Sequence, residues 1–184
     1  ALRSLRIDYA DVLILGWFNH GPPRRVLDAA LKLKDEGKVR FIAMSGHRRR
    51  LFAEHAQNSE SPIDIFMIRY NAAHPGAERD VFPFLPTTNR PGVYTYTTTS
   101  WGELLNPRKM PEGEPPMSST DCYRFALANP NVDMCLCGPK SMEEMDAALR
   151  TLDSPPASTE ELERWRRIGA HVHPKGVAEA PAAG

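Results

Sequence analysis

Asp11-Val-Leu-Ile-Leu-Gly-Trp-Phe18 has the pattern of a buried strand, and Val39-Arg-Phe-Ile-Ala-Met-Ser45 has that of a second one. Both contain continuous apolar runs, which are typical of parallel strands that are covered on both faces. Between them, apolar residues recur at helical spacing from about Arg24 to Glu36, and Gly37 stands where a helix is expected to end. The stretch therefore predicts a strand–helix–strand unit with parallel strands.

The rest of the chain repeats this alternation of strands and helices. Further strands are predicted at 63–71, 92–99 and 132–137, and helices at 48–58, 76–85, 119–128, 141–152 and 158–171. Each spacing is long enough for a crossover connection, so the pattern predicts a parallel α/β sheet. An open doubly wound sheet and part of an eight-stranded barrel both fit. The long loop at 101–117 has a length that often serves a function.

Composition excludes several classes of protein. The chain has 184 residues, enough for one domain with a good core. Its 23 basic and 23 acidic residues balance, so we expect neither a nucleic-acid nor a membrane partner. No apolar run approaches the roughly 18 residues of a membrane span. Three cysteines, an odd number, fit reduced thiols and predict a cytoplasmic protein.

The order of its motifs resembles the C-terminal part of the aldo-keto reductases. The resemblance covers residues 4–152 and rests on five stretches: Asp8 to Trp17, Glu36 to Arg40, Arg69-Tyr70-Asn71, Tyr96 to Leu105, and Gly138-Pro139-Lys140-Ser141. It implies an α/β fold, the (β/α)8 TIM barrel of that family, present here as a partial barrel of about five parallel strands with helices. We expect this domain to span residues 1–173, and residues 174–184 to form a flexible C-terminal tail.

The resemblance also implies a function, the NADP(H)-dependent reduction of an aldehyde or ketone to an alcohol. The family's catalytic Asp, Tyr and Lys lie on earlier strands, and its catalytic His falls at Gly16, which cannot polarise a carbonyl. We therefore predict no catalytic residue in this chain and expect it to be a fragment of a longer oxidoreductase that acts on a small carbonyl substrate.

The family's cofactor contacts can be carried over position by position. Ser45 matches the serine that binds the nicotinamide carboxamide, and Tyr96 the ring on which the nicotinamide stacks. The loop from Trp101 matches the segment whose amides hold the pyrophosphate. Lys140 and Ser141, before a helix N-terminus, suit the 2′-phosphate of NADPH. The predicted NADP(H)-binding residues are Ser45, Gly46, Tyr96, Trp101, Gly102, Leu104, Gly138, Lys140, Ser141 and Glu144.

Several positions depart from the family's pattern. Gly46 replaces a usual Asn, Met67 a usual Gln, and alanines stand at two adenine-contacting positions, Ala147 and Ala148. Ser45 also fits a strand-end turn, Tyr96 a core aromatic residue and Gly102 a turn glycine. The competing hypothesis is a catalytically inactive family member that acts as a nucleotide-binding or protein-interaction module. A third is a homodimer that completes a barrel from two half-barrels.

The two histidines near the end of the chain do not predict a metal site. His171 and His173 lie near a predicted helix end without a cysteine or carboxylate at ligand spacing.

Overall fold

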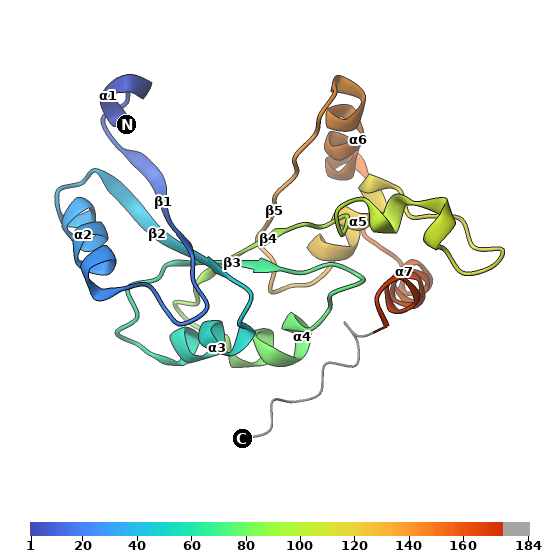
Figure 1. Ribbon diagram of the computed structural model, residues 1–184, viewed down its shortest axis with the longest axis horizontal. Coiled ribbons are helices and arrows are strands. Elements are labelled where there is room, and N and C mark those ends of the chain that lie inside the picture. Colours follow the sequence, from blue (N-terminus) through green and yellow to red (C-terminus); the bar gives the residue numbers. More distant parts are fainter. Residues whose placement is uncertain (175–184) are drawn as a thin grey trace. The chain divides into compact units, whose positions relative to one another are not determined.

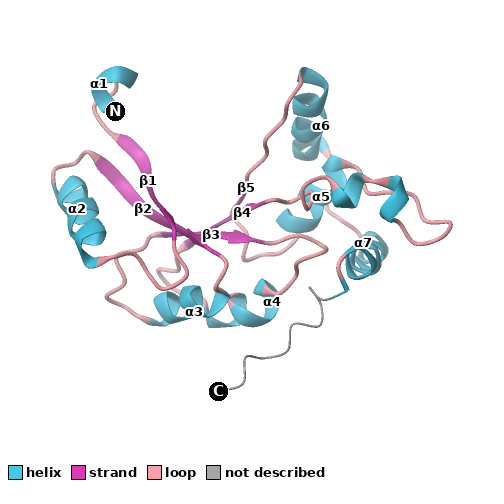
Figure 2. Cartoon of the chain, viewed as in Figure 1, coloured by secondary structure: helices cyan, strands magenta, loops and turns pink. Residues whose placement is uncertain are grey.

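The computed structural model describes residues 1–174 (Figure 1). The helices and strands follow in the order α1 (Leu2–Leu5), β1 (Ala10–Trp17), α2 (Arg24–Asp35), β2 (Val39–Gly46), α3 (Arg49–Gln57), β3 (Ile65–Arg69), α4 (Ala77–Asp80), β4 (Gly92–Tyr96), α5 (Ser119–Leu127), β5 (Met134–Cys135), α6 (Met142–Asp153) and α7 (Thr159–Val172) (Figure 2). Short 3-10 turns lie at Phe82–Phe84, Glu103–Leu105 and Pro107–Lys109. The predicted alternation of strands and helices is confirmed. The predicted tail lies, from residue 175 on, outside the described residues.

The chain divides into two compact units. The first contains Ala1–Ile68 and Asp80–Val93, and the second contains Arg69–Arg79 and the chain from Tyr94 on. The extent of a single domain over residues 1–173 stays a prediction. Each unit is described by itself below.

The first unit is built on β1, β2 and β3, which are parallel neighbours. Leu13 is paired with Ile42 in the register, and Ala43 with Ile65. Ile42 and Ala43 are completely buried, as expected for a strand covered on both faces. The strand–helix–strand order is confirmed, and α2 lies against β1 and β2. The predicted burial of the first strand is wrong, because β1 has no buried residue and the side chains of Ile14 and Trp17 are largely exposed.

Local sequence fixes where α2 ends and how it is held. Gly37 has a φ of 69°, a conformation that favours glycine, and the amides of Gly37 and Lys38 donate to the carbonyls of Lys34 and Leu33. Within the same unit, the Asp64 carboxylate accepts hydrogen bonds from Lys34 Nζ at 2.6 and 2.8 Å and from the Ile42 amide at 2.7 Å. One half-buried carboxylate thus ties α2 to β2.

The second unit contains β4 and β5 with helices α5, α6 and α7. The two strands are parallel and pair at Tyr94 with Met134 and at Thr95 with Cys135. Its buried core includes Leu104, Phe125, Trp165 and Ile168. Helices α5 and α7 both begin with a capping box, at Ser118 and Ser158, whose side chains accept the amides of Asp121 and Glu161. Both predicted helix starts are confirmed.

Three strands are shorter than the sequence predicts. β3 ends at Arg69 because the next residues enter a turn in which the His74 amide donates to the Asn71 carbonyl. β4 ends at Tyr96 because Thr97 has a φ of 52°, which is incompatible with a strand. β5 pairs with β4 at only two positions instead of spanning 132–137. The first two ends place turns at the carboxyl ends of strands, where the predicted site lies.

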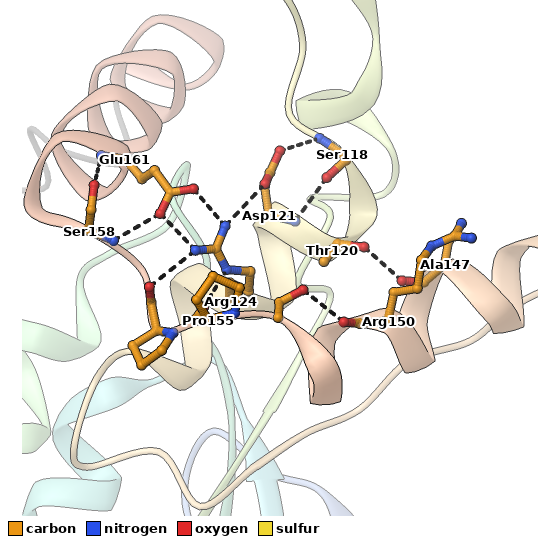
Figure 3. A network of polar contacts seen from close by, with 11 residues as sticks. Ser118, Thr120, Asp121, Arg124, Ala147, Arg150, Pro155, Ser158 and Glu161 are labelled. Carbon is orange, nitrogen blue, oxygen red and sulfur yellow. Dashed lines mark hydrogen bonds and ion pairs between the residues drawn. The ribbon is translucent and has the colours of Figure 1, made fainter.

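Arg124 on α5 anchors the start of α7 (Figure 3). Its guanidinium makes two parallel hydrogen bonds of 2.7 Å to the Glu161 carboxylate, and it also donates to the carbonyls of Pro155 and Pro156. The same group lies 5.2 Å from the centre of the Trp165 ring. Because the Arg124 side chain is only 11% exposed, this bidentate pair is more strongly held than a surface ion pair.

Replacing Arg124 with alanine should destabilise the protein by about 1–3 kcal/mol, because a half-buried carboxylate loses its partner. The hydrogen bond from Arg124 also lowers the pKa of Glu161 below its ordinary value of 4.5. A lowered folded-state pKa stabilises the protein above that value, and the contribution is lost as the pH falls. The difference between wild type and Arg124→Ala in urea unfolding should therefore be larger at pH 7 than at a pH well below the pKa of Glu161, where the hydrogen bonds from Arg124 to the Pro155 and Pro156 carbonyls still contribute. Arg167→Ala, an exposed change on α7, is the control. A gap that is equal at both pH values would contradict the assignment.

Candidate cofactor site

The predicted cofactor residues fall in both units. Ser45 and Gly46 belong to the first unit, and the residues from Tyr96 to Glu144 belong to the second. Each group has its own local geometry.

Ser45 and Gly46 lie at the carboxyl end of β2. The Ser45 carbonyl accepts the Phe18 amide at 2.8 Å, and Ser45 is paired in the register with Met67 of β3. A Cβ atom added to Gly46 would lie 2.3 Å from the Phe18 carbonyl oxygen, closer than real Cβ atoms approach. Gly46 therefore has a steric reason to be glycine, and the asparagine usual in the family could not occupy this position without a shift of the backbone.

Gly16 also has a backbone reason to be glycine. Its φ is 111°, in a region that side-chain-bearing residues rarely adopt, and the register of β1 against β2 shifts between Ile14 and Trp17. Just beyond, the Asn19 side-chain oxygen accepts the amides of His47 and Arg48 at 3.1 and 3.2 Å. A histidine at residue 16 would be strained, so this irregular strand end is adapted to glycine.

In the second unit, the buried Asn71 side chain joins two strand ends. Its amide nitrogen donates to the Thr97 carbonyl at 2.7 Å, directly after β4. Its side-chain oxygen accepts the amides of Ala73 and His74 at 2.9 and 2.8 Å, directly after β3. Asn71 has no exposed surface, so these hydrogen bonds are shielded from water. The motif Arg69-Tyr70-Asn71 thus fixes the loop that follows β4.

That loop has an unusual run of backbone conformations. Thr97, Ser100, Trp101 and Gly102 all have positive φ, between 52° and 84°. The amides of Gly102 and Leu104 donate to the Thr99 carbonyl, and the Glu103 amide donates to the Ser100 carbonyl. The loop is therefore shaped by its own hydrogen bonds before any ligand arrives.

The predicted residues of this loop differ in what they offer a ligand. The Trp101 side chain is 65% exposed, and a Cβ added to Gly102 would meet nothing within 4 Å, so the backbone there is open to approach. Leu104 is completely buried, its amide donates to the Thr99 carbonyl and its carbonyl accepts the Met117 amide, so this predicted residue offers a ligand neither its side chain nor a free backbone group. The Ser100 hydroxyl is buried without a hydrogen-bond partner in the described residues. Tyr96, half-buried, precedes the loop at the end of β4.

Sequence reasoning did not assign the side chains around Trp101. The Arg69 guanidinium lies 5.8 Å from the centre of the Trp101 ring, and the His74 ring meets Trp101 edge-on at 6.0 Å. His173, just after α7, stacks on His74 at 4.4 Å. The sequence signal that could have indicated these contacts is the position of Arg69 and His74 on either side of a predicted strand end.

The residues predicted to bind the 2′-phosphate lie at the N-terminus of α6. Lys140, Ser141 and Glu144 are exposed, as is Gly138, and Pro139 between them is half-buried. The Ser141 hydroxyl accepts the Glu144 amide at 3.2 Å, and the Glu144 carboxylate accepts the Lys140 amide at 2.7 Å. The Glu143 carboxylate accepts hydrogen bonds from the Ser141 hydroxyl and from the Glu143 backbone amide, and both lower the pKa of Glu143. The carboxylates of Glu143 and Glu144 thus lie with Lys140 at the N-terminal end of this helix, where the helix dipole is positive.

A hydrogen bond from a side chain of α5 links that helix to α6. The Thr120 hydroxyl donates to the Ala147 carbonyl at 2.7 Å (Figure 3). Ala147 matches one of the family's adenine-contacting positions, so the segment predicted to face the adenine is held to α5 through its backbone.

A comparison with protein-family models finds that the aldo/keto reductase family matches residues 1–121. This chain belongs to that family. Among curated proteins, the comparison of sequences finds no match.

Solved structures extend this result to the fold. The chain is similar to aldo-keto reductase AKR11C1 from Bacillus halodurans, in its holo form (TM-score 0.73, 21% identity, 91% of this chain and 61% of that chain) and its apo form (0.73, 21%, 91% and 64%). It is also similar to the thermostable aldo-keto reductase Tm1743 in complex with the inhibitor epalrestat (0.66, 21%, 91% and 62%). The fold is therefore a partial TIM barrel, as predicted, and not a doubly wound sheet. The chain spans about six tenths of the length of these structures.

The described residues contain neither a cluster of metal ligands nor a helix that could span a membrane. Within residues 1–174, no group of three His, Cys, Asp or Glu side chains is placed to hold a metal ion. In the same part of the chain, each helix is too short or too polar to cross a bilayer.

Replacing Asn71 with aspartate should loosen the loop after β4. A carboxylate can still accept the amides of Ala73 and His74, but it cannot donate to the Thr97 carbonyl, which would face a buried negative charge. We expect a loss of about 2–4 kcal/mol in unfolding free energy and faster proteolytic cleavage within residues 97–105. Asn106→Asp is the matched control, because the Asn106 side-chain oxygen accepts the Arg108 amide, a hydrogen bond that a carboxylate can also accept. Equal stability and cleavage of the two variants would contradict the role of Asn71.

Proposed function

We propose that this chain binds a nicotinamide adenine dinucleotide and supplies the cofactor half of a reductase that converts an aldehyde or ketone to an alcohol. The observation that carries the proposal is the preshaped loop at residues 97–105 in a chain of the aldo/keto reductase family. The buried, unpartnered Ser100 hydroxyl and the open backbone at Gly102 fit a phosphate-bearing ligand beside this loop.

Each predicted residue then has a distinct task. When bound, the cofactor supplies the hydride that reduces a carbonyl carbon. In the second unit, Tyr96 offers a ring face to the nicotinamide. The loop from Trp101 lies against the diphosphate, and Asn71 holds that loop in place. Reduction is proposed only together with the family's Asp, Tyr and Lys, whose positions this chain does not match, because a proton donor is needed at the carbonyl oxygen.

Preference for NADP(H) over NAD(H) is the finer part of the proposal. Lys140 offers a cation, Ser141 a hydroxyl, and α6 its positive end, all of which suit a 2′-phosphate. The carboxylates of Glu143 and Glu144 oppose a phosphate at the same place, and Glu144 already accepts the Lys140 amide. The balance between Lys140 and Glu144 should therefore set the preference.

The second candidate function is that of an inactive, nucleotide-binding or protein-interaction module. It is favoured by Gly16 and Gly46, because both glycines fit backbone geometries that a histidine or asparagine would strain. The cytoplasmic location stays a proposal, supported by three cysteines that are all free. The homodimer predicted from the sequence also stays a prediction, which light scattering would test.

Titration with NADPH and with NADH tests the proposed function. We expect saturable binding, followed by calorimetry and by tryptophan fluorescence. Lys140→Ala should weaken NADPH binding about tenfold, because a charge-assisted hydrogen bond is lost, and should leave NADH binding unchanged. Glu144→Gln should tighten NADPH binding selectively, because it removes a negative charge and keeps a hydrogen-bonding side chain.

Lys32→Ala, an exposed change on α2, is the matched control for Lys140→Ala. If folded protein binds neither nucleotide, cofactor binding is wrong and the protein-interaction module is preferred. If both nucleotides bind and Lys140→Ala affects them equally, the assignment of the 2′-phosphate site is wrong.

A further inference from the structure

Arg69 is a half-buried cation without a polar partner. It is the last residue of β3, and within residues 1–174 its guanidinium makes no ion pair or hydrogen bond. Its guanidinium carbon lies over the face of the Trp101 ring, 5.8 Å from the ring centre. A guanidinium that interacts with an aromatic face through its charge keeps its N–H donors available for other groups.

Other half-buried arginines of the chain are paired with carboxylates. Arg49 is bonded to Asp80, Arg124 to Glu161 and Arg164 to Glu114, each at 2.7 Å or less. A charge that is partly withdrawn from water is normally compensated in this way. Arg69 departs from the pattern set by these three residues.

The groups around Arg69 are basic or aromatic. Trp101 is 65% exposed, His74 meets it edge-on, and His173 stacks on His74. The carboxylate of Glu78, on α4, is already neutralised, because Arg166 binds it through two hydrogen bonds of 2.8 and 2.9 Å and Tyr70 donates to it. The surface at Trp101 therefore offers a cation and N–H donors to an incoming ligand, with no competing carboxylate among these side chains.

We propose that Arg69, held on the face of Trp101, binds the phosphate-type anion of a small ligand beside the loop at residues 97–105. A guanidinium can bind two oxygens of such an anion with parallel hydrogen bonds. The exposed indole of Trp101 supports the guanidinium from one side. The anion has two possible sources. If it is the diphosphate of the cofactor, the inference rests on the proposed function. If it is a phosphate on the carbonyl substrate, the inference does not depend on cofactor binding by this chain.

The test uses the 184-residue chain with inorganic pyrophosphate as the probe. Calorimetry at low salt should give saturable binding, accompanied by a change in tryptophan fluorescence, since Trp101 is exposed beside the site. Arg69→Gln should weaken this binding at least about tenfold, because a charge-assisted pair is lost. Arg69→Lys, which keeps the charge but not the planar fork, should give an intermediate affinity and covers the case in which Arg69→Gln does not fold.

Arg167→Gln, an exposed arginine on α7 without an assigned role, is the matched control. If pyrophosphate does not bind, or if Arg69→Gln and Arg167→Gln weaken it equally, the inference is overturned. If Arg69→Gln weakens NADH and pyrophosphate by a similar factor, the anion is the cofactor diphosphate. If it weakens pyrophosphate alone, the anion is carried by the substrate. Arg69-dependent binding of pyrophosphate in a chain that binds neither nucleotide would sink the proposed function and leave this inference standing.

Discussion

The geometry of the candidate site depends on the buried side chain of Asn71. An amide removed from water must have its donor and acceptor satisfied, and Asn71 achieves this by donating to the Thr97 carbonyl and accepting the amides of Ala73 and His74. These bonds join the turn after β3 to the loop after β4. Arg69 and His74 flank the first segment, and Trp101 lies in the second. One satisfied amide therefore sets the spacing of the groups that would meet a ligand.

Two glycines show how a departure from a family pattern can have a local cause. At Gly46 the Phe18 carbonyl occupies the space of a side chain, and at Gly16 the backbone adopts a φ of 111°. Both lie where β1 loses its register with β2 and the chain turns away. Backbone geometry therefore limits the allowed residues both at the end of β1 and at the end of β2.

Much of the fold could be predicted from the sequence because its signals are local. Apolar runs identified β1 and β2, Gly37 marked the end of α2, and serine capping boxes marked the starts of α5 and α7. The environment of Arg69 could not be predicted, because its contact with Trp101 joins residues 32 positions apart through the conformation of a loop. The carboxylates at the start of α6 were visible in the sequence, but the hydrogen bond by which the Glu144 carboxylate already occupies the Lys140 amide required the structure.

Amide hydrogen exchange with and without NADPH tests most directly whether this chain holds a dinucleotide. The account predicts slower exchange on binding in two segments of the second unit, residues 97–105 and residues 138–144, because a ligand that contacts both would suppress their local opening. The helix start at residues 119–121, in the same unit but outside the predicted contacts, should be unchanged. Protection confined to other segments, or no protection at saturating NADPH, would contradict the account.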